Sequence, residues 1–403
     1  MVKCARCVFA FAFMAFLAAF AAVCVPRGAK AALRRGTGGS AKTRLCKSLS
    51  SEFPRKVRFV ELNGGAARIA GRRLCNNRIR FRNGMIGYEY GNSGCEITNG
   101  CREVSTLLGF AKELRARNIP LLFVLAPCKM SFDGRLLPAG WECDNLNEQA
   151  RSLAGMLADS GVEVLDLVPR YASTREDVDA HFFITDHHWN VKTAFEATGL
   201  ICARLADILG EPALRGNARL DPASWKSGVL KSAFLGAHGR RTGRLFSGVE
   251  DFEYILPEFK TSQVSFAPGI GKRREGDYGS AELDRKYLRP SQRDWRWLAY
   301  GGPAFGVRMH RNLSPSVDLR CMVVKDSFGR HPVSFMSTVF REVVEVDPRL
   351  LNDAQTVDGA VDAYRPDVVV IVANPSSLLG KRWIAGLSRT CKGKEAADAF
   401  HVD

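Results

Sequence analysis

The feature that most constrains the fold is a regular alternation of helix-like and strand-like segments between residues 102 and 373. Apolar residues at helical spacing alternate with short, continuous apolar runs that are typical of buried parallel strands. Strands that alternate with helices favour a mostly parallel sheet covered by helices on both faces. The helices are expected at residues 104–117, 145–160, 190–209, 332–340 and 357–364, and the strands at 120–126, 162–167, 319–324, 343–346 and 367–373.

One long interruption separates the two halves of this pattern. Residues 210–315 are rich in Gly, Pro, Arg and aromatic residues and show only short alternating pieces, at 252–256 and 262–266. We interpret them as an inserted strand- and loop-rich segment of an α/β domain that spans residues 61–385. Residues 386–403 are then a C-terminal tail.

The N-terminus has the pattern of a targeting or anchoring segment. Residues 8–25 form an uncharged run of 18 residues, preceded by Lys3 and Arg6. That length lies between a signal-peptide core and a membrane span of roughly 20 residues. We expect residues 1–25 to be an uncleaved anchor that holds the body outside the cytoplasm. The alternatives are secretion after cleavage at a small-x-small site that ends at Ala31, and a buried N-terminal helix.

The net charge of +16 is confined to the start of the chain. Residues 1–85 contain 18 basic and 2 acidic residues, whereas the remainder contains 40 of each. A nucleic-acid binder needs a basic face on its folded domain, so the sequence does not predict a nucleic-acid partner. We interpret residues 26–60 as a basic linker and expect residues 1–85 to lie against an anionic membrane or wall surface.

The cysteines do not suggest a structural zinc site. Nine of the 12 follow the N-terminal segment, and none of these nine forms a CxxC pair. Cys202 and Cys321 lie in apolar patterns typical of buried free thiols. In an exported body, two pairs could close short loops: Cys95 with Cys101, and Cys128 with Cys143.

Reactive residue types follow the predicted strands, where open α/β sheets bind their ligands. Ser327 follows the strand that ends at Val324, and Asn374 follows the strand that ends at Ala373. Residues 185–190, Thr-Asp-His-His-Trp-Asn, directly precede a helix. A serine becomes a nucleophile when a histidine takes its proton and a carboxylate orients that histidine. The alternative role for Ser327 is a helix N-cap.

A metal site is an alternative for the histidine-rich segment. Asp186, His187 and His188, with His181 nearby, are all residue types that bind metals. Adjacent histidines point in different directions, however, and no HxH or HExxH spacing occurs. We expect Trp189 to be a packing residue, and His238 and His310 to be structural or surface residues.

Several short motifs, in a shared order over roughly residues 80–380, resemble known families. The order Asp186-x-His188-Trp189, then Asp326-Ser327-Phe328, then a strand ending at Asn374 is similar to the SGNH hydrolase-like domain of the alginate O-acetyltransferase family. The literal DHHW string resembles the DHHW proteins of Gram-positive bacteria. Four further stretches add to that likeness: residues 83–88 as a hairpin, the turn at 127–129, residues 234–243 and residues 346–349.

The resemblance implies a Ser-His-Asp triad for acyl transfer, without a metal or cofactor. Ser327 would be the nucleophile, His188 the general base and Asp186 its orienting carboxylate. Asn374 and the Ser327 backbone N–H would form the oxyanion hole. The sequence departs from the family at Lys325, where a glycine is common, and this lysine is expected either to be solvated or to interfere with the oxyanion site.

The resemblance therefore implies an extracytoplasmic O-acetyltransferase, or acetylesterase, that acts on a cell-surface polysaccharide. It also implies a membrane-bound O-acyltransferase as partner. The alternatives are a catalytically inactive polysaccharide-binding or accessory protein, and a metal-dependent hydrolase. The sequence does not separate transferase from esterase, because water and a sugar hydroxyl compete for the same acyl-enzyme.

Overall fold

The computed structural model describes residues 56–88, 101–129, 137, 145–268, 273–289, 296–302, 304–352 and 355–388. The expected anchor at residues 1–25, most of the linker, Cys95, Cys143 and most of the C-terminal tail lie outside these residues. None of the helices in the described ranges combines the length and the apolar character that a membrane crossing requires. Residues 64–403 form one compact unit.

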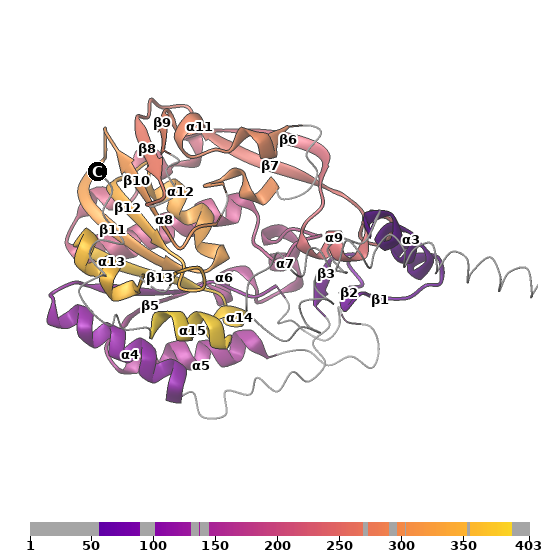
Figure 1. The fold of residues 1–403 in the computed structure, drawn as a ribbon, viewed down its shortest axis with the longest axis horizontal. Helices are drawn as coiled ribbons and strands as arrows, with labels where there is room; N and C mark the ends of the chain where they lie inside the picture. Colours follow the sequence, from indigo (N-terminus) through magenta and orange to yellow (C-terminus); the bar gives the residue numbers. More distant parts are fainter. Residues whose placement is uncertain are drawn as a thin grey trace, which may run out of the picture. The chain divides into compact units, whose positions relative to one another are not determined.

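An eight-stranded sheet forms the centre of this unit, in the order β5-β4-β13-β11-β12-β10-β8-β9 (Figure 1). The first five strands in that order run parallel, and the last three pair antiparallel. The predicted mostly parallel α/β fold is therefore confirmed. The strands are β4 (Leu121–Leu125), β5 (Glu163–Asp166), β8 (Gln263–Phe266), β9 (Arg273–Gly276), β10 (Val307–Asn312), β11 (Val317–Lys325), β12 (Phe340–Val346) and β13 (Val368–Ala373).

Helices cover both faces because successive side chains of a strand point to opposite sides. Val323 belongs to the core under α8 and α12, whereas its neighbour Val324 belongs to the core under α4, α5, α13 and α15. Both side chains are fully buried. The helices are α4 (Cys101–Ala116), α5 (Leu146–Asp159), α6 (Val168–Tyr171), α7 (Arg175–His181), α8 (Val191–Leu209), α12 (Arg330–Met336), α13 (Val357–Tyr364), α14 (Pro375–Leu378) and α15 (Lys381–Leu387).

One predicted boundary is wrong. The helix expected at residues 332–340 is the shorter α12, and β12 begins at Phe340 rather than at Val343. The hydroxyl groups of Ser337 and Thr338 donate to carbonyls of the last helical turn, those of Ser334 and Phe335. Hydroxyl groups that bond to the nearby backbone in this way compete with continuation of the helix.

The segment at residues 210–315 is strand- and loop-rich, as predicted, and it also contributes strands to the central sheet. Its strands β8, β9 and β10 extend the central sheet, and β6 pairs with β7 in a second, two-stranded sheet. No long helix occurs in its described part, as expected. Its other elements are β6 (Trp225–Phe234), β7 (Glu250–Pro257), α9 (Ala237–Thr242), α10 (Arg244–Ser247), α11 (Tyr278–Ala281) and the 3-10 helices η2 (Pro212–Leu214), η3 (Ala218–Leu220), η4 (Pro222–Ser224), η5 (Arg285–Leu288) and η6 (Arg296–Ala299).

The first described residues are helical although they fall in the expected linker: α3 spans Lys56–Ile69. A small antiparallel sheet follows, made of β1 (Leu74–Cys75), β2 (Arg78–Arg80) and β3 (Ile86–Tyr88). The hairpin expected at residues 83–88 is present as the β2–β3 pair. Gly84 has a φ of 91° in its turn, a conformation that favours glycine.

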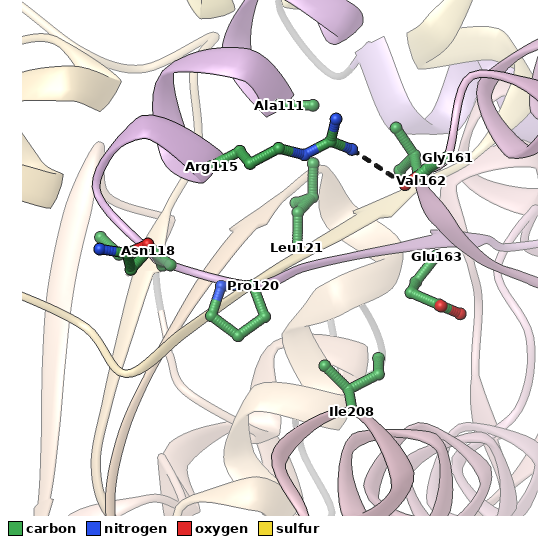
Figure 2. A pocket seen from close by; sticks show the side chains of 10 residues that line it. Ala111, Arg115, Asn118, Pro120, Leu121, Gly161, Val162, Glu163 and Ile208 are labelled. Carbon is green, nitrogen blue, oxygen red and sulfur yellow. Dashed lines mark hydrogen bonds between the residues drawn. The ribbon is translucent and has the colours of Figure 1, made fainter.

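A hollow of about 360 Å³ lies at the amino ends of β4 and β5 (Figure 2). Arg115 crosses it and donates to the Gly161 carbonyl at 3.1 Å. Ligands of such sheets bind at the carboxyl ends of the strands. A functional site is therefore expected at the opposite edge of the sheet.

Candidate active site

The carboxyl ends of three neighbouring strands, β4, β13 and β11, meet at one edge of the sheet. Leu125 of β4 pairs with Ala373 of β13, and Val372 pairs with Lys325 of β11. The residues that directly follow these strands are therefore neighbours in space. This register brings the Ser327 turn next to Asn374, which were predicted as candidates from sequence positions far apart.

Asp326, and not Ser327, is the N-cap of the turn after β11. Its Oδ1 accepts the Phe328 N–H, and its Oδ2 accepts the Asn374 N–H, each at 2.8 Å. Ser327 begins the 3-10 turn η7 (Ser327–Gly329), and its hydroxyl is directed to His188 instead. The capping alternative for Ser327 is thus wrong, because the preceding carboxylate already performs that role.

The segment with the two histidines is a short loop closed at its neck. Phe182 and Trp189 pair across the neck as an isolated antiparallel bridge. Asn190 then caps α8, with its side chain accepting the Thr193 N–H at 3.0 Å, as predicted. Trp189 is fully buried and is a packing residue, as expected.

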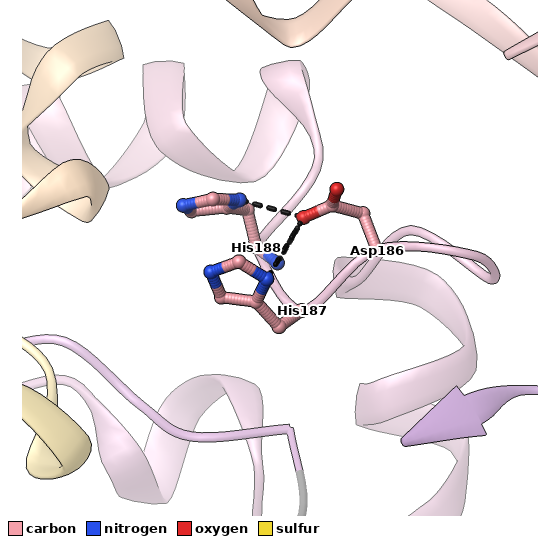
Figure 3. Close-up of side chains that lie close together, drawn as sticks. All are labelled: Asp186, His187 and His188. Carbon is pink, nitrogen blue, oxygen red and sulfur yellow. Dashed lines mark hydrogen bonds and ion pairs between the residues drawn. The ribbon is translucent and has the colours of Figure 1, made fainter. Parts of the chain in front are cut away.

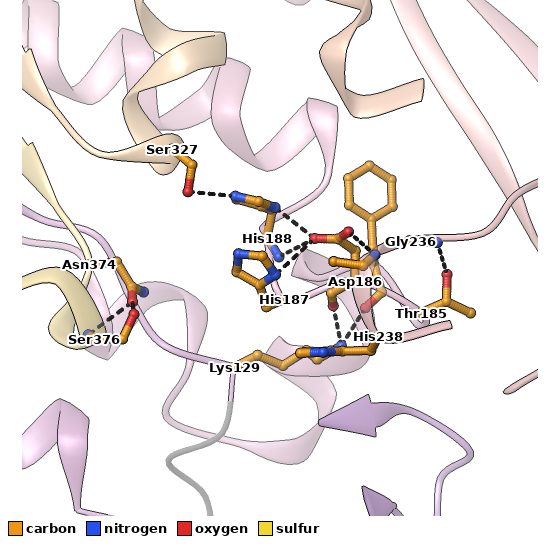
Figure 4. A network of polar contacts seen from close by, with 12 residues as sticks. Lys129, Thr185, Asp186, His187, His188, Gly236, His238, Ser327, Asn374 and Ser376 are labelled. Atoms are coloured by element: carbon orange, nitrogen blue, oxygen red, sulfur yellow. Dashed lines mark hydrogen bonds and ion pairs between the residues drawn. The ribbon is translucent and has the colours of Figure 1, made fainter. Parts of the chain in front are cut away.

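Asp186, His188 and Ser327 form a continuous hydrogen-bond relay (Figure 4). His188 Nδ1 lies 2.6 Å from Asp186 Oδ1, and its Nε2 lies 2.8 Å from Ser327 Oγ. A carboxylate only accepts hydrogen bonds, so Nδ1 carries the proton and Nε2 faces the hydroxyl with its lone pair. The structure therefore brings together the three residues that the sequence proposed for a triad.

Asp186 is held as a carboxylate. Burial by itself would raise its pKa, but the two adjacent imidazoles and hydrogen bonds from His188 and from the Ala237 N–H hold the pKa well below its usual value. The Ala237 N–H donates to Oδ2 at 2.6 Å. Both carboxylate oxygens are thus occupied, which fixes the orientation of the group that orients His188.

A buried lysine holds the loop from one side. Lys129 Nζ donates to three backbone carbonyls: those of Phe183 at 2.7 Å, Ile184 at 3.2 Å and Asp186. Burial lowers the pKa of Lys129 to about 8, against the attraction of Glu250 and Asp186. The side chain is still cationic at neutral pH, so all three of its N–H groups have acceptors. Lys129 was predicted only as part of a similar turn, without a role.

Glu250 holds the same loop through its N–H groups. Its carboxylate accepts from the backbone N–H groups of Ile184 and Thr185, each at 2.6 Å, and from the Thr185 hydroxyl. Burial raises the pKa of Glu250 to about 7, against these hydrogen bonds and the charge of Lys129. No motif indicated this residue, because it comes from β7, far from the loop in sequence.

The 210–315 segment also supplies an aromatic wall. The Trp297 ring stacks on the His188 ring, with centroids 3.9 Å apart and planes 17° apart. Gly236, at the start of α9, lies so close to the loop that an added Cβ would meet Asp186 Cβ at 2.4 Å. The sequence showed the stretch from residue 234 to 243 as a similarity, but not that it packs on the triad.

A pocket of about 260 Å³ opens beside Ser327. Tyr88, His187, Arg349 and Asn374 contribute to its lining. Within the described residues, the Ser327 backbone N–H has no hydrogen-bond acceptor. This N–H therefore remains available for an oxyanion, the role predicted for it.

The side chain of Asn374 already makes hydrogen bonds within the protein. Its Oδ1 accepts from the N–H and hydroxyl of Ser376, and its Nδ2 donates to the Pro127 carbonyl at 2.8 Å. An amide NH₂ has two hydrogens, so one remains for a ligand. The bonds to Pro127 and Ser376 fix the direction of that second hydrogen.

Lys325 is not solvated, contrary to one of the two expectations for it. Its side chain is 1% exposed, and Nζ lies 3.2 Å from Glu345 Oε2 on β12. Arg308 Nε of β10 lies 3.6 Å from the other carboxylate oxygen. Lys325 is therefore engaged in an ion pair within the sheet. A lysine at this position is compatible with an intact Ser327 turn.

Two further histidines, His238 and His310, are buried. His238 accepts from Arg78 Nε at 2.9 Å through Nδ1, and His310 Nδ1 lies 2.8 Å from Glu282. Both are structural residues rather than surface residues. His181 Nδ1 lies 2.9 Å from the Thr193 hydroxyl.

Asp186, His187 and His188 are close enough to suggest a metal site (Figure 3). Two ligands of a tetrahedral zinc ion, each about 2.0–2.1 Å from it, are roughly 3.3 Å apart. His188 Nδ1 and Asp186 Oδ1 are only 2.6 Å apart, with the proton between them. An ion could bind there only if this pair separated. The observed geometry fits a proton relay better.

The comparisons with known proteins agree with the fold described above. Residues 98–241 match a family model described as the SGNH hydrolase-like domain of acetyltransferase AlgX. Curated protein sequences gave no match.

Solved structures show the same fold at low sequence identity. PatB1 of Bacillus cereus is 17% identical, with a TM-score of 0.56 over 70% of this chain and 91% of that protein. PatB1 with a sulfonyl adduct gives a TM-score of 0.53 at the same identity and coverage. A DHHW family protein from Eubacterium siraeum is 14% identical, with a TM-score of 0.56 over 78% and 95% of the two chains. The predicted resemblance is therefore confirmed: residues 98–241 are similar to the SGNH hydrolase-like domain of acetyltransferase AlgX, and the chain shares the fold of PatB1 and of a DHHW family protein.

Proposed function

We propose that the chain is an extracytoplasmic O-acetyltransferase of the SGNH type, which transfers acetyl groups to a hydroxyl group of a cell-surface polysaccharide. The observation that carries the proposal is the relay from Asp186 through His188 to Ser327, with distances of 2.6 Å and 2.8 Å. In this geometry the histidine can take the serine proton while the carboxylate stabilises the resulting imidazolium.

The reaction has two half-reactions. Ser327 Oγ attacks the carbonyl carbon of an acetyl ester, and its proton passes to His188 Nε2 and then to the leaving oxygen. The acceptor hydroxyl then attacks the acetyl-serine, the bond from carbon to Oγ breaks, and the proton returns through His188 to Ser327. In both halves the oxyanion lies against the Ser327 N–H and the second amide hydrogen of Asn374, and such donors contribute roughly 3–4 kcal/mol each.

The family match supports acetyl transfer as the reaction, because the matching model is described as that of an acetyltransferase. The likeness to PatB1 suggests a chemical probe, since that protein has been solved with a sulfonyl adduct. A sulfonyl fluoride reacts with an activated serine, so it reports on the relay without requiring the natural donor.

The proposed location and partners follow from the N-terminal segment. Residues 1–25 would hold the domain outside the cytoplasm, and the basic residues 26–85 would lie against an anionic membrane or wall. A membrane-bound O-acyltransferase would supply the acetyl groups. If the segment is a cleaved signal peptide, the domain is instead secreted.

The test is to measure p-nitrophenyl acetate hydrolysis and labelling by a sulfonyl fluoride with the full-length protein. Ser327→Ala is expected to abolish labelling, and both Ser327→Ala and His188→Ala to lower hydrolysis by at least 10³-fold. Ser152→Ala, an exposed serine on α5, is the matched control and should behave as wild type. Equal rates in all four proteins would show that the relay is not catalytic and would favour the accessory role.

A second measurement separates transfer from hydrolysis. An oligosaccharide acceptor is added with the ester, and acetylated product is sought by mass spectrometry. Acetylated oligosaccharide identifies a transferase, whereas acetate alone identifies an esterase. Loss of turnover with a chelator, in place of loss with Ser327→Ala, would identify the metal-dependent alternative.

A further inference from the structure

One imidazole at the site has no part in the relay. His187 lies against His188, with ring centroids 3.8 Å apart and planes 38° apart. Trp297 stacks on the opposite face of His188, so the relay histidine is held between two rings. This position gives His187 a packing role, but packing alone does not need an imidazole.

His187 presents a nitrogen to the Ser327 pocket. The two imidazoles lie one over the other with their distal Nε2 atoms on the same side, away from Asp186 (Figures 3 and 4). His188 Nε2 reaches Ser327, and His187 lines the pocket that opens beside Ser327. Ser327 Oγ and His187 Nε2 therefore face the same small space.

His187 Nε2 is an acceptor of hydrogen bonds. Its other nitrogen, Nδ1, makes no hydrogen bond within the described residues, but it lies 3.3 Å from Asp186 Oδ1, and the negative charge there favours the tautomer with the proton on Nδ1. Burial and the neighbouring charge of His188 lower the pKa of His187 to about 3. The ring is therefore neutral at physiological pH and offers a lone pair at Nε2.

The attacking hydroxyl group cannot use this acceptor. A hydroxyl has one hydrogen, and in the proposed reaction that hydrogen must go to His188. The partner of His187 is then a second hydroxyl group of the same acceptor. The two rings lie against each other, with centroids 3.8 Å apart, so the two groups that they bind must be close together on the acceptor, as hydroxyl groups on adjacent carbons are.

We infer that His187 Nε2 binds a second hydroxyl group of the acceptor, so that the site selects carbohydrates with hydroxyl groups on adjacent carbons. This inference rests on the proposed function and specifies its acceptor. Water also has two hydrogens and can occupy both nitrogens, which accounts for hydrolysis as the competing reaction. A simple alcohol or a deoxy sugar can occupy only one.

The test compares two acceptors with p-nitrophenyl acetate as donor and the full-length protein as enzyme. One acceptor is a methyl glycoside with adjacent hydroxyl groups, and the other is its deoxy analogue, which lacks one of them. The wild type is expected to acetylate the diol roughly threefold to tenfold faster, the effect of one hydrogen bond between neutral groups. The products are quantified by mass spectrometry.

Two variants decide the role of His187. His187→Phe keeps a ring on His188 but removes the acceptor, and its preference for the diol should fall to about one. His187→Gln keeps an acceptor oxygen and should retain part of the preference. If His187→Phe keeps the wild-type preference for the diol, the inference is overturned, whatever the preference of His187→Gln.

The outcome for the wild type separates the role of His187 from the proposed transferase activity. Acetylation of both acceptors at equal rates refutes selection by His187 but leaves the transferase proposal standing. Acetylation of neither acceptor, in a protein whose Ser327 still reacts with the sulfonyl fluoride, overturns transfer and the inference with it.

Discussion

A single methyl group at Gly236 should disable the site. Gly236 has a φ of −71° and a ψ of −175°, which any residue can adopt, so alanine there causes no backbone strain. Its Cβ, however, would lie 2.4 Å from Asp186 Cβ, 2.6 Å from the Thr185 carbonyl oxygen and 2.7 Å from Asp186 Oδ2. Carbon atoms in ordinary contact are about 3.5 Å apart, so Asp186 or the α9 backbone must move by about 1 Å.

The expected size of the effect follows from that displacement. A shift of about 1 Å in a catalytic group can cost about 10²-fold in rate, and overpacking typically costs about 1–3 kcal/mol of stability. We therefore expect Gly236→Ala to lower sulfonyl fluoride labelling and p-nitrophenyl acetate hydrolysis about 100-fold, with a lower melting temperature. Gly199→Ala in α8 is the control, since nothing lies within 4 Å of its added Cβ. That variant should gain about 0.5–1 kcal/mol and keep its activity.

The result that would refute this reasoning is a Gly236→Ala protein with the wild-type rate and melting temperature. It would mean that the loop with Asp186 has room to adjust without disturbing the relay. A loss of stability alone, with normal labelling of Ser327, would place the strain in the α9 backbone rather than in Asp186.

Two further substitutions test the buried charges around the site. Lys129→Met leaves three backbone carbonyls without donors, at a cost of about 1–3 kcal/mol each, but it also removes a buried ammonium group whose burial costs roughly 3 kcal/mol. We therefore expect the free energy of unfolding, measured in urea, to fall by roughly 3 kcal/mol, and the reaction of Ser327 with the sulfonyl fluoride to become slower. Lys231→Met, at an exposed position, should show neither effect. Lys325→Met tests how the ion pair with Glu345 affects stability at low pH. Burial would raise the pKa of Glu345, but Lys325 and Arg308 lower it to about 2. The pair thus contributes roughly 3 kcal/mol above pH 4.5 that is lost as the pH falls toward 2, and the substitution should move acid unfolding, followed by tryptophan fluorescence, to higher pH. An unchanged acid transition would contradict that assignment.

Local patterns in the sequence were sufficient to predict the five parallel strands of the sheet, and the family resemblance implied the three residues of the relay. The apolar runs that became β4, β11 and β13 are buried on both faces, so their composition identifies them without knowledge of their neighbours. Because parallel strands place their carboxyl ends at one edge, the positions of Ser327 and Asn374 in the chain already indicated a shared site.

The sequence could not show what holds the site in place. Lys129 and Glu250 are 121 positions apart, and they bind one loop only because the fold brings the turn after β4 and the start of β7 to it. Trp297 and Gly236 likewise reach His188 and Asp186 from the strand- and loop-rich segment at residues 210–315. These contacts depend on close packing between distant segments, and such packing leaves no periodic signal in either segment.

The sequence by itself determined which chemistry is available: a serine after one strand, an Asp-x-His before a helix, and strands that bring Ser327 and Asn374 to one edge. Only the tertiary structure decided how the chemistry is arranged. It gave the capping role to Asp326 and thereby freed the Ser327 hydroxyl, and it buried Lys325 against Glu345. It also turned His187 toward the pocket. The physical reason is that residue types and strand order are local properties, whereas the direction and charge of a side chain depend on every group packed around it.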